Sequence, residues 1–328
     1  MKPSVLITNL VIPPEYLDIY GKTFTVHYTP TPEDRTKALS SNWLPDVRGV
    51  VTSGSNGLQP EFLDAMQQLE IVCVKGAGYD KLDLGAMERR GLPVTHSPGV
   101  NAPSVAEHAI ALMLAAMRRV PQADAAVRRG EWTSARALRP TMTGKRLGIL
   151  GLGRIGMEIA ERAHGGFKMP VAYHSRNPRK DVPYRYCASP AALAAESDFF
   201  VVACPGGPAT YHIVDADVIG KLGPKSYIIN VARGTVIDTP PLVDALKAGR
   251  IAGAGLDVVE GEPVVPEALL DLPNVVITPH LGGRSENAAN DTLDLVLENL
   301  KAHFSGKPVL TPIPESQKWR RTAPASVA

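Results

Sequence analysis

The feature that most constrains the fold is a glycine-rich hexapeptide, GLGRIG, at Gly151–Gly156. The apolar run RLGIL precedes it, as expected for a buried strand, and the helix-like segment MEIAERA follows it. A G-x-G-x-x-G hexapeptide is a weak signal alone, but between a strand and a helix it is typical of a turn that binds the pyrophosphate of a dinucleotide. Gly151 permits the tight turn, Gly153 lets the backbone approach the phosphates, and Gly156 allows close helix packing. The sequence therefore predicts a dinucleotide site here.

Short apolar runs rich in valine and isoleucine alternate with stretches of helical period along the chain, which is typical of parallel sheets built from βαβ units. Five such runs precede residue 100, and they begin at Val5, Phe24, Gly49, Ile71 and Pro93. Six more begin at Arg146, Pro170, Asp198, Ser226, Gly253 and Val275. Long helices are expected from Asn101 to about Val120 and from about Ser285 to Ala302. The 328 residues therefore predict an α/β protein with two domains, the second a doubly wound Rossmann-type sheet.

Charge argues against a nucleic-acid partner. The net charge is only +2, and lysines and arginines are spread along the chain rather than clustered on one face. The arginine pairs at 89–90, 118–119 and 128–129 are expected on solvated helix edges. The basic cluster at 318–321 is expected in a loosely held terminus, and the tail beyond Pro314 is a candidate for disorder.

Cysteine usage and hydropathy favour a cytoplasmic protein. Cys73, Cys187 and Cys204 are far apart and form no C-x-x-C pair, so neither a disulfide framework nor a metal site is expected. The N-terminus turns polar at once, so no secretory signal is expected. No apolar run approaches the roughly 18 residues that a membrane span requires. We therefore expect a protein of the reducing cytoplasm without a membrane partner.

The end of the strand after the hexapeptide indicates which dinucleotide binds. A carboxylate about 20 residues past the glycines would bind the ribose 2′-hydroxyl of NAD, but the sequence there reads YHSRNPRK. Ser175 and Arg176 instead supply a hydroxyl and a guanidinium, which can meet a 2′-phosphate through several hydrogen bonds. The sequence therefore predicts a preference for NADP(H), with NAD(H) possible if Arg176 only faces solvent.

Three late segments carry residues suited to catalysis. Arg233 follows a buried strand in NVARG, where an unpartnered charge would be costly. Glu262 lies in a loop after the strand of LDVVEGEP, and His280 ends the last strand in TPHLGG. Residues at the carboxyl ends of strands face the binding crevice of an open α/β sheet, so we expect these three to converge there.

With these residues in place, the chain from about Gly49 to Pro312 resembles the D-isomer-specific 2-hydroxy acid dehydrogenase family. The motifs are GAGYDKLD, NAPSVAEHA, GKRLGILGLGRIG, NVARG, GLDVVEGEP and TPHLGG. Within the family, YHSR together with PHLGG is most similar to the NADPH-preferring glyoxylate, hydroxypyruvate and 2-ketogluconate reductases. The resemblance implies hydride transfer between NADP(H) and C2 of a small 2-keto or D-2-hydroxy acid.

The resemblance also implies a role for each catalytic candidate. His280 matches the general acid that gives a proton to the C2 oxygen, a task for which imidazole is suited near neutral pH. Glu262 matches the carboxylate that orients this ring and favours its charged form. Arg233 matches the group that binds the substrate carboxylate and polarises the C2 carbonyl, an electrostatic interaction often worth about 3–4 kcal/mol.

Ligand-binding residues follow from the same resemblance, and no metal is implied. The expected substrate-binding residues are Ser53, Gly54, Lys75, Gly76, Ala77 and Gly78, where bare glycine N–H groups suit an anion. The expected cofactor-binding residues are Gly151, Leu152, Gly153, Arg154, Ile155, Gly156, Ser175, Arg176, Asn177, Cys204, Pro205, Thr210, Val231, Ala232, Asp257 and Gly282.

The family arrangement predicts the domain boundaries. Residues 1–100 and 285–328 are expected to form a smaller, flavodoxin-like substrate domain, and residues 101–284 the dinucleotide-binding domain, with the substrate in the cleft between them. Residues from about 101 to 145 resemble a dimerisation arm, so a homodimer is expected.

The chain departs from the family at two places. Gly206-Gly207 replaces bulkier residues, which leaves the contacts to the nicotinamide ribose open. Lys75 stands where many relatives carry a small or apolar residue, and it either helps to hold an acidic substrate or is solvated. Glu107 and His108 are interpreted as structural, and Cys204 as a neighbour of the cofactor rather than a nucleophile.

Several alternatives stay open. Phosphoglycerate dehydrogenation, another NAD-linked activity of the family, and oxidation of formate or phosphite are the alternative enzymes. A dinucleotide-sensing binding protein without turnover is the alternative from a different class, but it would need a broken catalytic set, and all three positions are filled. The physiological 2-keto acid is not fixed by the sequence, because substrate choice depends on the geometry of the site.

Overall fold

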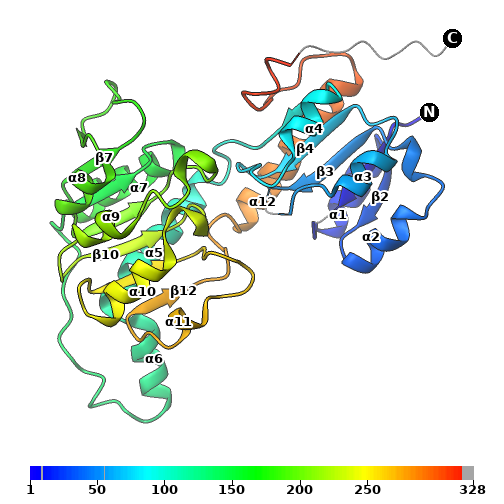
Figure 1. Cartoon of the computed structure of the whole chain (residues 1–328). Helices are drawn as coiled ribbons and strands as arrows, with labels where there is room; N and C mark the ends of the chain where they lie inside the picture. Colours follow the sequence, from blue (N-terminus) through cyan, green and yellow to red (C-terminus); the bar gives the residue numbers. More distant parts are fainter. Residues whose placement is uncertain (9, 55, 320–328) are drawn as a thin grey trace. The chain divides into compact units, whose positions relative to one another are not determined.

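The computed structural model describes residues 1–8, 10–54 and 56–319. Contacts within the chain divide it into two compact units (Figure 1). Unit 1 comprises Met1–Asn101 and Glu286–Ala328, and unit 2 comprises Ala102–Ser285. Each unit contains one parallel β-sheet covered by helices, so the predicted α/β class is confirmed.

Unit 1 is built on a five-stranded parallel sheet in the order β2-β1-β3-β4-β5, which is the predicted flavodoxin-like order. Its strands are β1 (Ser4–Thr8), β2 (Thr25–Thr29), β3 (Gly49–Ser53), β4 (Ile71–Lys75) and β5 (Val94–Thr95). Its helices are α1 (Pro14–Gly21), α2 (Pro32–Leu39), α3 (Pro60–Ala65), α4 (Leu84–Arg89) and α12 (Glu286–Phe304), with the 3₁₀ helix η1 (Leu44–Asp46).

Both faces of the unit 1 sheet are buried, which explains why its strands read as continuous apolar runs. Successive residues of a strand point to opposite faces. Leu6 and Val50 pack in a cluster with residues of α3 and α4, whereas Val5 and Val51 pack in another cluster with residues of α1 and α12. The C-terminal helix α12 therefore belongs to the core of the N-terminal domain.

Unit 2 is built on a seven-stranded parallel sheet in the order β12-β11-β10-β9-β6-β7-β8. Numbered from β6, this is the Rossmann order 3-2-1-4-5-6 with one strand added. The strands are β6 (Leu147–Leu150), β7 (Val171–His174), β8 (Arg185–Tyr186), β9 (Phe199–Val202), β10 (Tyr227–Asn230), β11 (Gly253–Leu256) and β12 (Val275–Ile277). The strand order reverses direction between β6 and β9, which is where ligands bind in open sheets of this kind.

Helices cover both faces of the unit 2 sheet. Ile149 and Val201 pack with residues of α5 and α7 on one face, and Leu150 and Val202 pack with residues of α8, α9 and α10 on the other. The helices are α5 (Ala102–Arg118), α6 (Val120–Arg128), α7 (Arg154–Phe167), α8 (Pro190–Ala195), α9 (Ala216–Gly220), α10 (Thr239–Lys247) and α11 (Glu267–Leu270), with the 3₁₀ helices η2 (Pro208–Thr210) and η3 (Gly234–Val236).

The structure corrects three local expectations. The helix predicted from Asn101 to about Val120 runs from Ala102 to Arg118, and α6, which was not expected, follows it after Arg119, whose left-handed φ of 53° separates the two helices. The short strand β8 was not expected. Arg90 is not on a solvated helix edge. Its guanidinium donates to the carbonyls of Leu63 and Met66, which are carbonyl groups at the end of α3 that need hydrogen-bond donors.

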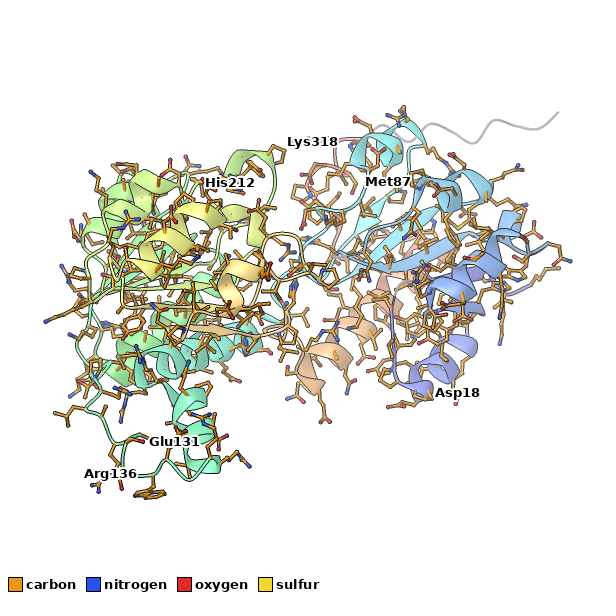
Figure 2. The ribbon with its side chains drawn as sticks, turned by 60° about the horizontal axis from the view of Figure 1, so that its bottom comes forward. Asp18, Met87, Glu131, Arg136, His212 and Lys318 are labelled. Atoms are coloured by element: carbon orange, nitrogen blue, oxygen red, sulfur yellow. The ribbon has the colours of Figure 1, made fainter. Side chains whose placement is uncertain are left out.

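The connection from α6 to β6 extends away from the sheet of unit 2, and Glu131 and Arg136 lie at its projecting end (Figure 2). Two of its apolar side chains face solvent, since Trp132 is 64% exposed and Leu138 is 99% exposed. A chain segment that leaves such side chains uncovered is typical of an interaction surface.

The described part of the C-terminal tail is tied to unit 1. Ile313 is buried, the Ser316 hydroxyl hydrogen-bonds to the carbonyl of Val94 at 3.1 Å, and Trp319 packs against a core cluster of the unit. Residues 315–319 therefore do not fit the expectation of a disordered tail. The remainder of the predicted basic cluster, Arg320 and Arg321, lies outside the described residues.

Candidate active site

The glycine turn between β6 and α7 has the geometry that a dinucleotide requires. Gly151 has a φ of 100°, and a Cβ there would lie 2.5 Å from the backbone nitrogen of Cys204. A Cβ on Gly156 would lie 2.2 Å from the carbonyl oxygen of Gly151, so this glycine allows the helix to pack against the turn. Gly153 differs, because a Cβ there would meet nothing within 4 Å. The turn thus leaves open space at the glycine predicted to face the phosphates.

Helix α7 begins directly after this open position. Gly153 is its N-cap and cannot cap the helix with a side chain, so first-turn N–H groups stay available to an anion. Arg179 stabilises the turn, because its guanidinium donates to the carbonyl of Leu152 at 3.0 Å. The same guanidinium forms an ion pair with Asp181. These contacts of Arg179 were not expected from the sequence. These residues fit a dinucleotide.

Replacing Gly153 with alanine should weaken nucleotide binding without harming the fold. The added methyl group meets no protein atom, but it occupies the space into which the phosphates would come. We expect the melting temperature to be unchanged and the Kd for NADPH to rise about tenfold or more. A tenfold rise is a loss of about 1.4 kcal/mol of binding free energy. Intrinsic fluorescence titration measures the Kd. Gly165→Ala, on the same helix and also in open space, is the control, and equal affinities in the two variants would contradict this account.

The segment after β7 holds the residues predicted to select the cofactor. Ser175 and Arg176 follow the strand directly, and Arg176 is exposed. The Ser175 hydroxyl donates to the carbonyl of Asn177 at 2.7 Å, which closes a tight turn. The nearest carboxylate in this segment, Asp181, already pairs with Arg179. A hydroxyl and an exposed guanidinium therefore stand where a carboxylate would favour NAD.

Other predicted cofactor residues lie at the same edge of the sheet. They follow β9 (Cys204, Pro205, Thr210), β10 (Val231, Ala232), β11 (Asp257) and β12 (Gly282). Thr210 donates through its hydroxyl to the carbonyl of Pro205 at 2.7 Å, which shapes the loop after β9. Burial raises the pKa of the Cys204 thiol to about 11, so this cysteine is a poor nucleophile at neutral pH.

His280 and Glu262 form a hydrogen-bonded pair. Nδ1 of His280 lies 2.9 Å from Oε1 of Glu262, and both side chains are about one-third exposed, at 37% and 35%. Burial acts to raise the pKa of Glu262, but the hydrogen bond from His280 and the positive charges of His280 and Arg233 outweigh it and lower that pKa. Glu262 is therefore a carboxylate at neutral pH, and it holds the ring so that Nε2 can face a reactant.

Arg233 stands on a turn that the sequence specifies closely. Asn230, buried at the end of β10, accepts a hydrogen bond from the Ala232 N–H and donates to the Arg233 carbonyl, each at 3.0 Å. The next residue must be glycine, because a Cβ on Gly234 would lie 2.0 Å from the backbone of Val259. The structure therefore brings Arg233 close enough to Glu262 to affect its ionisation.

Gly206, in the loop after β9, lies against Arg233. A Cβ on Gly206 would lie 2.6 Å from Cγ of the arginine. Glycine at this position thus gives the aliphatic stem of Arg233 room that a bulkier residue would fill.

Asp257 supports the turn that carries His280. Its buried carboxylate accepts the backbone N–H groups of Leu281 and Gly282, each at 2.8 Å, and the hydroxyl of Thr278 at 2.6 Å. Burial acts to raise its pKa, but these bonds and one from His108 lower it to about 2. A role of this carboxylate in cofactor binding stays a prediction.

The low pKa of Asp257 predicts how stability depends on pH. The pKa in the folded chain, about 2, lies below the ordinary value of 3.8, so this carboxylate stabilises the fold above about pH 4 and loses that effect as the pH falls through about 2. Asp257→Asn should therefore unfold at lower urea concentration than wild type at neutral pH, by on the order of 2 kcal/mol. The difference should narrow as the pH falls from about 4 toward 2. A stability difference between wild type and Asp257→Asn that does not change with pH would contradict this prediction. So would an equal loss of stability in Asp124→Asn, which changes an exposed carboxylate.

The predicted substrate residues come together in unit 1. Ser53 ends β3, Lys75 ends β4, and a Cβ on Gly54 would lie only 1.7 Å from the carbonyl oxygen of Gly78. The loops after the two strands therefore touch. Gly76 has a φ of 121°, a conformation that favours glycine, and a Cβ there would meet nothing within 4 Å.

The C-terminal half of unit 1 fixes the loop that contains these glycines. Nδ1 of His96 donates to the carbonyl of Ala77 at 2.9 Å, and Tyr79 donates through its hydroxyl to Glu315 at 3.0 Å. The predicted substrate residues thus belong to unit 1, and the predicted catalytic and cofactor residues belong to unit 2.

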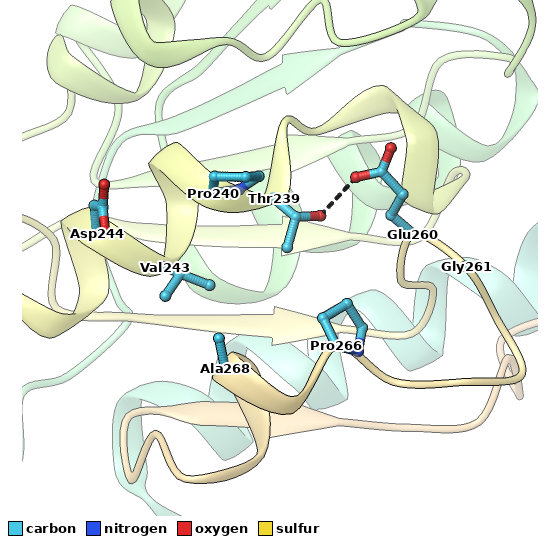
Figure 3. A pocket seen from close by; sticks show the side chains of 8 residues that line it. All are labelled: Thr239, Pro240, Val243, Asp244, Glu260, Gly261, Pro266 and Ala268. Carbon is cyan, nitrogen blue, oxygen red and sulfur yellow. Dashed lines mark hydrogen bonds between the residues drawn. The ribbon is translucent and has the colours of Figure 1, made fainter.

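A mostly apolar cavity of about 480 Å³ lies beside the segment that leads to Glu262 (Figure 3). Thr239 donates to Glu260 at 2.9 Å, and Nε2 of His212 lies 2.8 Å from the other oxygen of that carboxylate. This second histidine–glutamate pair was not expected from the sequence. The cavity is lined by Thr239, Pro240, Val243, Asp244, Glu260, Gly261, Pro266 and Ala268.

Two negative findings apply to residues 1–8, 10–54 and 56–319. No group of three or more His, Cys, Asp or Glu side chains is arranged to hold a metal ion there. No helix in that part combines the length and apolar character needed to cross a membrane.

Comparisons with known proteins agree with this geometry. The family model described as "D-isomer specific 2-hydroxyacid dehydrogenase, NAD binding domain" matches residues 110–282. Hydroxyphenylpyruvate reductase of Plectranthus scutellarioides is 47% identical over 268 residues, which are 81% of this chain and 85% of that protein. The 2-ketogluconate reductase of Gluconobacter oxydans is 38% identical over 315 residues, 95% and 99% of the two chains. A crystal structure of NADPH-dependent glyoxylate/hydroxypyruvate reductase from Sinorhizobium meliloti, in complex with NADP and malonate, is similar with a TM-score of 0.89 and 40% identity, covering 98% of this chain and 100% of that one.

Proposed function

Because the chain belongs to the D-isomer specific 2-hydroxyacid dehydrogenase family, whose members are nicotinamide-dependent oxidoreductases, we propose that it reduces glyoxylate, hydroxypyruvate or a similar small 2-keto acid with NADPH. The observation that carries the proposal is the 2.9 Å pair of His280 and Glu262, with Arg233 near enough to lower the pKa of that carboxyl. The names of its relatives, including the NADPH-dependent reductase from S. meliloti, support the substrate class and the cofactor.

His280 supplies the proton in this proposal. Its Nδ1 faces Glu262, so Nε2 is the atom that donates to the C2 oxygen as negative charge develops there. Glu262 accepts the hydrogen bond at Nδ1 and holds the ring in one orientation, as an acidic partner does for other catalytic histidines. The same nitrogen takes the proton back when a D-2-hydroxy acid is oxidised.

Arg233 binds the substrate. Its planar guanidinium can hold a carboxylate through two parallel hydrogen bonds and can place positive charge beside the C2 carbonyl. The loop from Lys75 to Gly78 is proposed to bind the substrate carboxylate through backbone N–H groups, which glycines leave uncovered.

The glycine turn and the segment after β7 are proposed to hold NADPH. When bound, this cofactor supplies the hydride that is added to C2 of the substrate. Gly153 and the first turn of α7 receive the pyrophosphate, and Ser175 and Arg176 receive the 2′-phosphate.

A panel of 2-keto acids assayed with both cofactors tests this function. We expect oxidation of NADPH with glyoxylate or hydroxypyruvate at several-fold higher kcat/KM than with NADH. Arg176→Ala should raise the KM for NADPH about tenfold and leave that for NADH unchanged, since one charge-assisted contact to the phosphate is lost. Lys180→Ala, which removes the neighbouring exposed cation, should have a much smaller effect.

The panel also separates the alternatives. Clear preference for NADH would contradict the roles of Ser175 and Arg176. Hydroxyphenylpyruvate belongs in the panel, because a reductase of that substrate is 47% identical to this chain. Nucleotide binding without turnover of any 2-keto acid would favour a sensing protein.

The quaternary structure and location are part of the proposal. The exposed apolar side chains of Trp132 and Leu138 support a homodimer formed through the connection before β6, and sedimentation of a monomer alone would exclude it. Three free cysteines support a reducing, cytoplasmic setting.

A further inference from the structure

One face of α5 contacts the turn that carries His280. Ser104 and His108 are four residues apart and therefore lie on the same side of the helix. The Ser104 hydroxyl donates to the carbonyl of Gly282 at 2.7 Å, and Nε2 of His108 lies 2.9 Å from the hydroxyl oxygen of Thr278. The helix thus reaches both ends of the segment from Thr278 to Gly282, with His280 at its centre.

The direction of these hydrogen bonds can be assigned. The Thr278 hydroxyl has one proton, which it donates to the Asp257 carboxylate at 2.6 Å. The same hydroxyl oxygen can then only accept from His108, whose Nε2 also lies 3.1 Å from Oδ1 of Asp257. His108 therefore carries a proton on Nε2 and donates it to both partners. A side chain without a donor at this point would leave the network incomplete.

The backbone of the turn needs such support. His280 has a φ of 55°, an uncommon left-handed conformation for a residue with a side chain, and such conformations persist where surrounding contacts over-determine them. Its N–H donates to the carbonyl of Asp257 at 2.9 Å, and the next two N–H groups donate to the Asp257 carboxylate. The Asp257 carboxylate thus holds the backbone of the turn, and His108 and Thr278 fix the orientation of this carboxylate.

We propose that His108 is a positioning residue for the reaction: by donating from Nε2 to Asp257 and Thr278, it holds the turn that places the His280 ring against Glu262. This inference rests on the proposed function, and it gives His108 a role in catalysis beyond the structural role expected from the sequence. Ser104 contributes from the next turn of the same helix by fixing Gly282.

Three substitutions of His108 distinguish a donor at Nε2 from simple packing. Glutamine places an amide nitrogen near the position of Nε2 and keeps the donor, asparagine is too short to reach it, and leucine removes it while filling space. We expect His108→Leu and His108→Asn to lower kcat about tenfold with little change in the KM for NADPH, because small misplacement of a catalytic group is costly. His108→Gln should stay within about twofold of wild type.

Hydrogen exchange provides a readout that does not depend on turnover. Peptides covering residues 277–284 should exchange faster in the leucine and asparagine variants than in wild type or in His108→Gln, because the N–H groups of Leu281 and Gly282 lose a fixed acceptor. The control is His164→Leu on α7, which removes a histidine that hydrogen-bonds to the Met169 carbonyl and packs edge-on against Tyr184. It should change neither measurement.

The two proposals can fail separately. If the wild-type protein reduces no 2-keto acid, the proposed function fails, while the exchange data still test the positioning network. The proposed role of His108 would be overturned if His108→Leu kept the wild-type kcat and the wild-type hydrogen-exchange rates. It would also be overturned if His108→Gln lost as much kcat as His108→Leu at the same melting temperature.

Discussion

Replacing His280 with alanine should lower kcat for 2-keto acid reduction by about 10³-fold, the range expected for loss of a positioned general acid. The side chain is about one-third exposed and lies in the turn after β12, so its removal should change the melting temperature little. The Kd for NADPH should also stay close to that of wild type. Steady-state rates, thermal melting and fluorescence titration of the same preparation measure the three quantities.

The matched control for this variant is His212→Ala. His212 also pairs with a glutamate in unit 2, at 2.8 Å from Glu260, but it is not among the residues proposed to touch the reactants. We expect it to keep most of the wild-type turnover. A His280 variant with wild-type kcat, or equal losses in the two variants, would show that this histidine is not the acid.

Arg233→Ala should reduce kcat/KM by about 10²–10³-fold through loss of binding and of charge stabilisation at the carbonyl oxygen. Arg233→Lys should recover only part of the loss, because an ammonium group cannot form two parallel hydrogen bonds to a carboxylate. The KM for the keto acid should rise in both variants, whereas the Kd for NADPH should not.

The control for Arg233 is Arg185→Ala, which removes an arginine of the same unit that pairs with Glu196. This surface pair should contribute little to either stability or rate. If Arg233→Lys matches wild type, two-point binding of the carboxylate is not required, and the proposed role of the guanidinium is wrong.

The fold could be predicted because its signals are local. The valine- and isoleucine-rich runs gave the strands on both buried sheets, and Gly151, Gly153 and Gly156 each show the contact environment that their spacing indicates. The end of α5 was predicted to within two residues, but α6 was not expected, although Pro121 in its first turn is a residue that favours the start of a helix.

The catalytic candidates could also be predicted, because each follows a strand of one parallel sheet. The residues that hold these candidates in place could not be predicted. Asp257 and Thr278 directly follow neighbouring strands, but the partner that completes their network, His108, lies about 150 residues earlier on a helix. Nothing in the spacing of AEHA shows which strand end it will meet. The close approach of Gly206 to the stem of Arg233 is a similar case, because the sequence does not show this contact.

The most direct test of the account follows the hydride itself. Hydroxypyruvate is reduced with NADPH deuterated at the transferable position of its nicotinamide, and the product is analysed by chiral chromatography and mass spectrometry. The account predicts D-glycerate carrying deuterium at C2, formed in proportion to the NADPH consumed, and no such product with the His280→Ala variant on the same time scale. An L-product, a product without the label, or equal formation by the variant would contradict it.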